Sequence, residues 1–226
     1  MARQVHLFEP SGDILGPGDR FGVDQDDAVH WLRSLPGESV DLIITDPAYE
    51  SLEKHRAVGT TTRLTADWFP IFPNSRYPEF FAELYRVLRK DAHCYVLCDQ
   101  ETMFVVKPIA WDKVKMGMGY HYRASYECIL FFEKGKRNLA NKGIRDVLPF
   151  PRIRGGYPTE KPVELLEVLV QQSSSEGELV VDPFMGSGST GEAALKHGRR
   201  FAGCDVAERS VAMTIDRLAT KRTEDL

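Results

Sequence analysis

The sequence predicts an α/β fold with a mainly parallel central sheet. Short apolar, β-branched runs of strand length alternate with amphipathic helical patterns. Several of these runs end abruptly in Asp-Pro or in a glycine-rich turn, as strands do when they deliver a loop to one edge of a sheet. At 226 residues, the chain is long enough for one sizeable domain and too short for two typical ones. We therefore expect residues 1–226 to form a single domain of strands joined by helices.

The first half of the chain predicts strands and helices on both sides of a long irregular segment. Residues 1–20 are rich in Gly, Pro and Asp, which indicates a loose N-terminal arm. A short strand at Phe21–Asp24 precedes a helix from Ala28 to Leu35, which Pro36 and Gly37 end. The further elements expected are a buried strand at Val40–Thr45, a functional loop from Glu50 to Arg76, an amphipathic helix at Pro78–Arg89 and a strand at His93–Cys98.

The second half continues the alternation. A proline at the first turn of a helix is favourable, and Pro162 occupies such a position before an apolar helical pattern. The elements expected in order are a strand at Glu127–Phe132, the helix that Pro162 opens, a strand at Leu179–Val181, a helix to about His197, a strand at Arg200–Cys204 and a last helix to about Lys221.

Composition excludes several classes of protein. No apolar run has the length of a membrane span, and residues 1–10 lack the basic and apolar layout of a signal peptide, so we expect a cytoplasmic location. The four cysteines have no zinc-ligand spacing and do not suggest a disulfide framework, so we expect them to be small core residues and expect no metal.

Charge is segregated along the chain. The formal net charge is −4, whereas a nucleic-acid binder usually presents basic surface. Between Lys134 and Lys161, however, eight basic residues face only two acidic ones, Asp146 and Glu160. Because binding depends on the local field, the overall charge does not exclude nucleic acid. Taken alone, the basic run is more typical of a solvated loop.

The tetrapeptide Asp46-Pro47-Ala48-Tyr49 directly follows an apolar strand. An amino group on a heteroaromatic ring is a weak nucleophile, because its lone pair is delocalised into the ring. Two acceptors, the Asp46 carboxylate and the Pro47 carbonyl, would take both N–H bonds and favour a pyramidal nitrogen, each hydrogen bond contributing about 1.5–3 kcal/mol. Tyr49 offers a flat face for an extruded base. On these four residues alone, a plain Asp-Pro turn is the simpler interpretation.

A second motif joins a strand to a helix near the C-terminus. Gly186 and Gly188 follow the strand that ends at Asp182, and such a turn lets the backbone approach a ligand closely. Asp205 ends the next strand, where an acidic side chain can accept hydrogen bonds from two ribose hydroxyls. Together they indicate a nucleoside-containing cofactor. A structural turn with Asp205 capping the following helix is the alternative, at about even weight for each feature.

The two motifs together resemble those of the amino-methyltransferases of DNA. The signatures of that family are D/N/S-P-P-Y/F/W and F-x-G-x-G, which appear here as Asp46-Pro47-Ala48-Tyr49 and Phe184-Met185-Gly186-Ser187-Gly188. The order of the motifs resembles the permuted beta group. Tyr157–Pro162 and Val180–Phe184 are similar to its H-P-T-x-K-P and V-x-D-P-F segments, and the resemblance covers about Phe21 to Leu218. Ala48 departs from the usual second proline, which affects only the rigidity of the loop.

The resemblance implies a Rossmann-like S-adenosylmethionine-dependent methyltransferase fold with a small recognition insertion. Asp46 and Pro47 would hold the target amine, and Tyr49 would stack on a flipped-out base. S-adenosylmethionine is the implied cofactor, with Asp205 on its ribose and Thr159, Lys161 and Asp182 near its methionine end. The full set of residues implied at the cofactor is Asp27, Asp46, Thr159, Lys161, Asp182, Phe184, Gly186, Gly188 and Asp205.

Duplex DNA is the implied substrate. The recognition region would lie at about 135–156, where the basic excess would contact phosphates, and the loop after Tyr49 would close over the flipped nucleotide. The candidate DNA-binding residues are Lys54, His55, Arg56, Arg63, Lys136, Arg137, Lys142, Arg145, Arg152 and Arg154. A cognate restriction endonuclease and a second copy of the chain are candidate partners, and no membrane is expected.

Adenine N6 is the expected target, because the family tends to use Asp at the first motif position for adenine and Ser for cytosine. Three alternatives stay open. The first is the same chemistry on cytosine N4. The second is methyl transfer to RNA or to a protein glutamine, although the protein-directed enzymes normally carry the cofactor loop first. The third is a non-catalytic DNA-binding module that keeps the fold.

Overall fold

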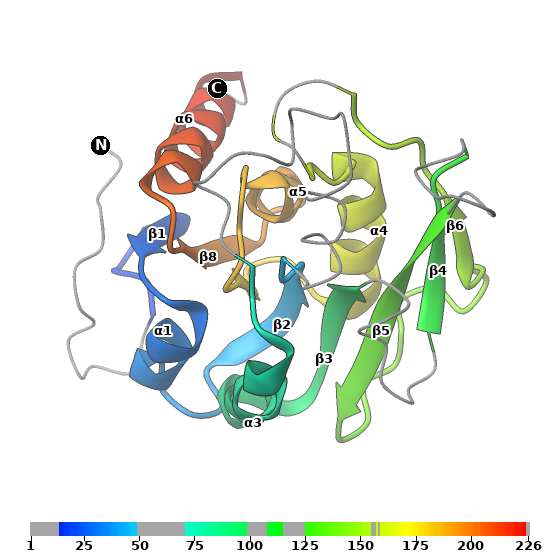
Figure 1. Cartoon of the computed structure of the whole chain (residues 1–226), viewed down its shortest axis with the longest axis horizontal. Coiled ribbons are helices and arrows are strands. Elements are labelled where there is room, and N and C mark those ends of the chain that lie inside the picture. Colours follow the sequence, from blue (N-terminus) through cyan, green and yellow to red (C-terminus); the bar gives the residue numbers. More distant parts are fainter. Residues whose placement is uncertain are drawn as a thin grey trace.

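The computed structural model of the protein describes residues 14–48, 71–98, 108–114, 125–154, 157 and 159–224. Within these residues, strands and helices alternate as expected in the first and last parts of the chain, whereas four strands follow one another between Leu88 and Pro149 with no described helix among them (Figure 1). The strands are β1 (Phe21–Gln25), β2 (Val40–Thr45), β3 (Leu88–Cys98), β4 (Pro108–Asp112), β5 (Tyr126–Lys134), β6 (Val147–Pro149), β7 (Leu179–Asp182) and β8 (Arg200–Asp205). The helices are α1 (Ala28–Ser34), the 3-10 helix η1 (Asn74–Arg76), α3 (Tyr77–Val87), α4 (Val163–Ser173), α5 (Ser189–Lys196) and α6 (Glu208–Glu224).

The strands form one sheet in the order β1-β8-β7-β2-β3-β5-β4-β6. The pairs from β1 to β3 are parallel, whereas β5 is antiparallel to both β3 and β4. From β2 the chain proceeds to β3 on one side, and from β7 it proceeds to β8 on the other. The order of the strands therefore reverses between β7 and β2, and ligands of open α/β sheets bind at the carboxyl ends of the strands at such a point.

Helices cover both faces of the sheet. One core packs α1 and α3 against side chains such as Ile43 and Cys94, and the other packs α4, α5 and α6 against their neighbours Leu42 and Tyr95. Successive residues of a strand point to opposite faces, so the apolar residues Leu42, Ile43 and Ile44 of β2 fill both cores, as expected of a buried parallel strand. All four cysteines are buried, which confirms their assignment to the core.

Three sequence-based expectations need correction. Residues 14–20 do not form a loose arm, because Ile14 and Leu15 are buried in the core and Arg20 donates a hydrogen bond to the Leu195 carbonyl at 3.1 Å. The segment expected to be irregular up to Arg76 forms η1 at its end. The strand expected to start at His93 begins at Leu88, directly after α3.

Two residues that flank the segment 49–70, Ala48 and Phe72, are in contact. The amide of Phe72 donates a hydrogen bond to the carbonyl of Ala48 at 2.7 Å, and the Phe72 ring is buried against Tyr77, Phe80 and Phe184. The segment itself lies outside the described residues, as do the predicted base-contacting residue Tyr49 and the predicted DNA-contacting residues Lys54, His55, Arg56 and Arg63. The packing of Phe72 in the core thus holds the residues that flank this segment in place.

The described helices include none that is long and apolar enough to cross a membrane.

Candidate active site

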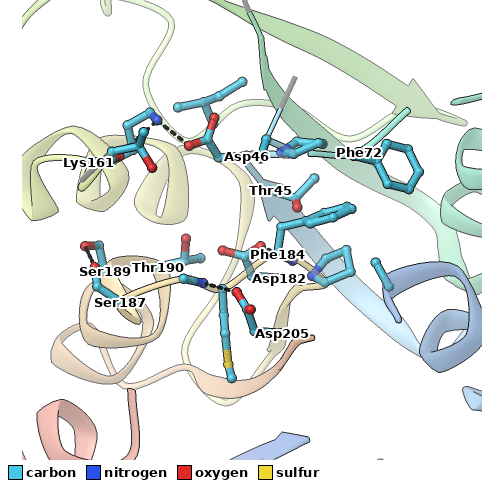
Figure 2. Close-up of a pocket in the computed structure, with 18 of the residues that line it drawn as sticks. Thr45, Asp46, Phe72, Lys161, Asp182, Phe184, Ser187, Ser189, Thr190 and Asp205 are labelled. Carbon is cyan, nitrogen blue, oxygen red and sulfur yellow. Dashed lines mark hydrogen bonds and ion pairs between the residues drawn. The ribbon is translucent and has the colours of Figure 1, made fainter. Parts of the chain in front are cut away.

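Asp46 projects from the end of β2 toward Lys161, which precedes α4 (Figure 2). The Lys161 ammonium donates a short hydrogen bond to Oδ2 of Asp46, and it donates a second one to the carbonyl of Thr159 at 3.2 Å. The Lys161 side chain is buried and the Asp46 side chain is mostly buried. This pair thus joins the end of β2 to the start of α4, although its two residues lie 115 positions apart in the sequence.

Asp46 and Lys161 are oppositely charged groups in a largely buried environment. Burial raises the pKa of the Asp46 carboxyl, and the nearby Lys161 ammonium only partly offsets this effect. For Lys161, burial acts to lower the pKa, but the negative charges of Asp46 and Glu127 outweigh it and the pKa is raised. Lys161 is therefore a cation at neutral pH.

The second oxygen of Asp46 is buried and has no hydrogen-bond partner within the described part of the chain. A buried acceptor without a partner is costly, by about 1–3 kcal/mol, and therefore rare. Such an atom at the end of β2 points to a ligand that supplies a donor.

The turn between β7 and α5 lies beside Asp46. Asp182 accepts a hydrogen bond from the Phe184 amide at 3.0 Å, which starts the turn, and Gly186 and Gly188 adopt φ angles of 51° and 82°. A Cβ atom on Gly186 would lie 3.3 Å from the ring of Tyr157, and one on Gly188 would lie 2.9 Å from the side chain of Thr214. Glycine is thus required by both the backbone conformation and the space.

Asp205, at the end of β8, stabilises the same turn. One carboxylate oxygen accepts a hydrogen bond from the Gly186 amide at 3.1 Å, and the other accepts one from the Ala207 amide at 2.8 Å. The first of these contacts is drawn in Figure 2. A carboxylate offers about four acceptor positions, so these two bonds leave capacity for ligand hydroxyls. The two interpretations considered from the sequence, structural capping and ligand binding, are therefore compatible.

Asp27 caps the first turn of α1, where it accepts hydrogen bonds from the amides of Val29 and His30 at 3.1 Å each. The guanidinium of Arg76 also binds both of its oxygens, at 2.7 and 2.8 Å. The hydrogen bonds from Arg76 are the main reason that the pKa of Asp27 falls to about 2. Arg76 lies over the Phe72 ring as well, at 5.2 Å from the ring centre.

These groups surround one cavity of about 360 Å³ at the carboxyl ends of β2, β7 and β8. The predicted site residues that line it are Asp27, Asp46, Pro47, Thr159, Lys161, Asp182, Phe184, Gly186 and Asp205. Gly188 is the exception. It is the N-cap residue of α5 and packs on Thr214 behind the lining residues, so the described geometry gives it a role in the turn.

Comparison with known proteins decides the family. The family model for N6 and N4 methyltransferases, described as DNA methylase, matches residues 40–216, which include both motifs. The chain belongs to the DNA methylase family. The resemblance drawn from the sequence motifs is thereby confirmed at the level of DNA amino-methyltransferases.

Among similar proteins, the DNA adenine methyltransferase YhdJ of Escherichia coli (strain K12) is 29% identical over 85% of this chain and 80% of its own length. The crystal structure of M1.HpyAVI with SAM superposes with a TM-score of 0.63 at 23% identity, over 88% of this chain and 100% of the other. The cytosine-N4-specific PvuII DNA methyltransferase gives 0.68 at 13% identity, over 91% and 92%. These similarities confirm the predicted methyltransferase fold.

Several residues of the methylase site were not expected from the sequence. Arg76 and Phe72 line the cavity, and each has a partner far away in sequence, Asp27 and Phe184 respectively, that no local pattern indicates. Arg217 of α6 donates hydrogen bonds to the hydroxyls of Ser189 at 2.8 Å and Ser187 at 3.3 Å, and it pairs with Glu160. Arg217 therefore joins the glycine turn of the methylase to the segment that carries Lys161.

The basic segment does not form one surface beside the cavity. Lys134 pairs with Ala92 near the start of β3, so the residues after it lie at the amino edge of the parallel strands. There the amide of Lys136 binds Asp91, and the guanidinium of Arg137 donates to Glu178 at 2.7 Å, just before β7. Lys136 and Arg137 therefore lie at the edge of the sheet opposite to Asp46 and Asp182, and their contact with DNA stays a prediction.

The rest of the segment crosses toward the site. Asn141 is hydrogen-bonded to Gln172 near the end of α4, which leaves exposed Lys142 far from the start of that helix. After Arg145, strand β6 pairs in parallel with β4 and returns the chain to the carboxyl edge. Exposed Arg152 and Arg154 follow it there. In the methylase, these two exposed arginines and buried Lys161 are the described basic residues of 134–161 that share an edge with Asp46.

Proposed function

We propose that this DNA methyltransferase transfers a methyl group from S-adenosylmethionine to the N6 amino group of an adenine that is flipped out of duplex DNA. One observation carries the proposal. The buried oxygen of Asp46 that lacks a partner lies on the cavity that Gly186 and Asp205 also line. An acceptor for the target amine and a turn suited to a nucleoside cofactor thus share one space.

The residues at the end of β2 would activate the amine. The Asp46 carboxylate and the Pro47 carbonyl accept its two N–H bonds, so the nitrogen lone pair turns out of the plane of the ring. Tyr49 stacks on the flipped base, which offsets part of the cost of unpairing it. Lys161 fixes the other oxygen of Asp46 and so holds the carboxylate in one orientation. S-adenosylmethionine, when bound, supplies an electrophilic methyl group on its sulfonium.

The cavity residues fit this cofactor. Asp205, whose two oxygens retain acceptor capacity, would bind the ribose hydroxyls, and Asp27 would lie near the adenosine. Phe184 and Gly186 would form the wall of the turn, with Gly188 holding its shape. The methionine end of the cofactor carries a carboxylate and an ammonium, and each needs a group of opposite charge in the protein. The residues proposed to lie at this end are Thr159, Lys161 and Asp182. Acidic and basic groups are both present there.

The affinity for S-adenosylmethionine should rise with pH in a way that depends on Asp182. Burial raises the pKa of this carboxyl to about 7. In the free protein, folding therefore favours the protonated form of Asp182. The stability that this protonation contributes is fully present below pH 3.8 and is lost as the pH rises through about 7. If Asp182 binds the methionine ammonium, affinity measured by calorimetry should increase about tenfold between pH 5.5 and 7. This range lies below the ionisation of an amino group near pH 8.

The Asp182→Asn variant is the control for that titration. It should bind the cofactor weakly and with little dependence on pH. An unchanged pH dependence in this variant would show that another group is responsible.

Arg152 and Arg154 are the described residues proposed to contact DNA phosphates near the flipped base, together with Lys54, His55, Arg56 and Arg63. Lys142 and Arg145 are exposed and would extend this contact along the duplex. We further propose that residues 1–226 act as one domain of the beta group, with recognition carried by the later part of 135–156. A restriction endonuclease and a second copy of the chain stay candidate partners.

Adenine is proposed as the target for two reasons. The first motif position is Asp, and a relative, YhdJ, is named an adenine methyltransferase. The N4 of cytosine is the second candidate, because the fold superposes well on the cytosine-N4-specific PvuII enzyme. The two amines present the same donors, so the choice depends on the pocket around the base.

Mass spectrometry of nucleosides distinguishes these targets. Unmethylated plasmid DNA is incubated with the protein and a deuterated methyl donor and then digested. Labelled N6-methyldeoxyadenosine is the expected product, and labelled N4-methyldeoxycytidine alone would contradict the adenine assignment. Structured RNA, incubated in parallel, should stay unlabelled, and labelling of neither polymer would favour a non-catalytic binding module.

A further inference from the structure

Four charged side chains of alternating sign lead away from the proposed amine-binding oxygen. Beyond Asp46 and Lys161, Glu127 of β5 places Oε2 at 3.8 Å from the Lys161 ammonium. Its other oxygen, Oε1, lies 3.4 Å from the ammonium of Lys113, which follows β4. The side chains of Lys113, Glu127 and Lys161 are 10%, 19% and 9% exposed, so solvent screens these interactions only weakly.

The Lys161 ammonium therefore lies between two carboxylates that compete for it. Lys161 donates its hydrogen bond to Asp46, while its contact with Glu127 is longer. A stronger pull from Glu127 would weaken the hold of Lys161 on Asp46 and leave more negative charge on the oxygens of Asp46. Lys113 acts in the opposite sense, because it neutralises Glu127 and reduces that pull.

We propose that Glu127 and Lys113 are positioning residues that set how tightly Lys161 is held by Asp46, and hence how strongly the free oxygen of Asp46 accepts the target amine. The role in catalysis rests on the proposed function. Neither residue lines the cavity, so neither is assigned a contact with cofactor or base. Glu127 acts on Asp46 through one intervening side chain, Lys161, and Lys113 acts through two, Glu127 and Lys161.

The proposal gives opposite signs for two substitutions. Glu127 acts to raise the pKa of Asp46, so Glu127→Gln should lower that pKa, tighten the pair with Lys161 and slow methyl transfer. Lys113→Gln should raise the pKa of Asp46, because Glu127 is no longer neutralised. The other ionisable groups near Asp46, namely Lys161, Asp182 and Tyr157, with Asp205 beside Tyr157, are unchanged in both variants.

The first experiment needs no catalysis. Carboxyl carbons of the free protein, labelled with ¹³C-aspartate, are titrated by NMR, and the signal absent from Asp46→Asn identifies Asp46. Relative to the wild type, the Asp46 midpoint should move down by roughly half a pH unit or more in Glu127→Gln and up by a similar amount in Lys113→Gln. In the double variant, most of the effect of Lys113→Gln should disappear, because it acts through Glu127.

The second experiment measures single-turnover methyl transfer against pH. In Glu127→Gln the acid limb should move to lower pH while the plateau rate falls roughly 3- to 10-fold, and in Lys113→Gln the limb should move to higher pH with the plateau retained. The affinity for S-adenosylmethionine should change little in Lys113→Gln. Glu133→Gln, at the far end of the same strand, is the matched control and should behave as the wild type.

Shifts of the same sign in both variants, or no shift in either, would overturn the proposal. If Glu127→Gln does not fold, an upward shift of the Asp46 midpoint in Lys113→Gln still supports it, and its absence still contradicts it. Failure of the wild type to methylate adenine would overturn the proposed function instead. In that case the expected shifts of the Asp46 midpoint in the NMR titration would still be observed. Failure of the positioning proposal is thus distinguishable from failure of the proposed function.

Discussion

Replacing Asp46 by alanine should reduce the rate of methyl transfer by at least about 10³-fold, because the target amine loses the charged acceptor that turns its lone pair out of the ring. The effect should appear in kcat at saturating cofactor and DNA. Binding of S-adenosylmethionine, measured by calorimetry, should stay within a few-fold of the wild type, since the turn built from Gly186 and Asp205 does not depend on Asp46.

The same substitution leaves Lys161 buried with a more distant carboxylate, so some loss of stability is expected. Thermal unfolding of the variant therefore accompanies the rate measurement. Asp216→Ala, the same change on the exposed face of α6, is the control and should retain full activity. Near-normal turnover by folded Asp46→Ala would show that the assigned chemistry is wrong.

Replacing Asp205 by alanine should weaken binding of S-adenosylmethionine by about 10- to 100-fold, equivalent to the loss of one or two hydrogen bonds to a charged acceptor. Two causes act together. The ligand loses an acceptor for its ribose, and the amides of Gly186 and Ala207 lose the carboxylate that holds the turn in place. The KM for the cofactor should rise accordingly, and saturating cofactor should restore most of kcat.

Asp205→Asn separates these two causes. The amide oxygen can still accept a hydrogen bond from one of the two backbone amides, so part of the turn is retained while the charge is lost. We expect an affinity between those of the wild type and Asp205→Ala. A fall in kcat with unchanged KM would instead assign Asp205 to the reaction itself.

Much of the frame could be predicted because its signals are local. The run Val40–Thr45 is apolar on both faces and is followed by Asp-Pro, so both the strand and the position of Asp46 at its carboxyl end follow from a few residues. The same holds for β7 with Asp182 and for β8 with Asp205. Parallel strands then bring these three carboxylates to one edge of the sheet, as observed.

The contacts and positions that could not be predicted from the sequence depend on partners distant in sequence. Arg76 and Asp27 are 49 residues apart, and neither carries a pattern that indicates the other. Lys136 and Arg152 belong to one basic run, but the antiparallel pairing of β5 and the parallel return through β6 place them at opposite edges of the sheet. Strand β6 has only three residues, too few to show a period.

The hydrogen bond between Phe72 and Ala48 has a consequence for how such enzymes diverge. It closes the frame immediately before and after residues 49–70, and the buried Phe72 ring secures one side of that closure. A longer, shorter or different stretch after Tyr49 could be accommodated between these two points without moving the carboxylates or the glycine turn. Selection could then alter the proposed contacts of that stretch with the flipped nucleotide while Asp46, Asp182, Asp205 and the glycine turn are inherited unchanged.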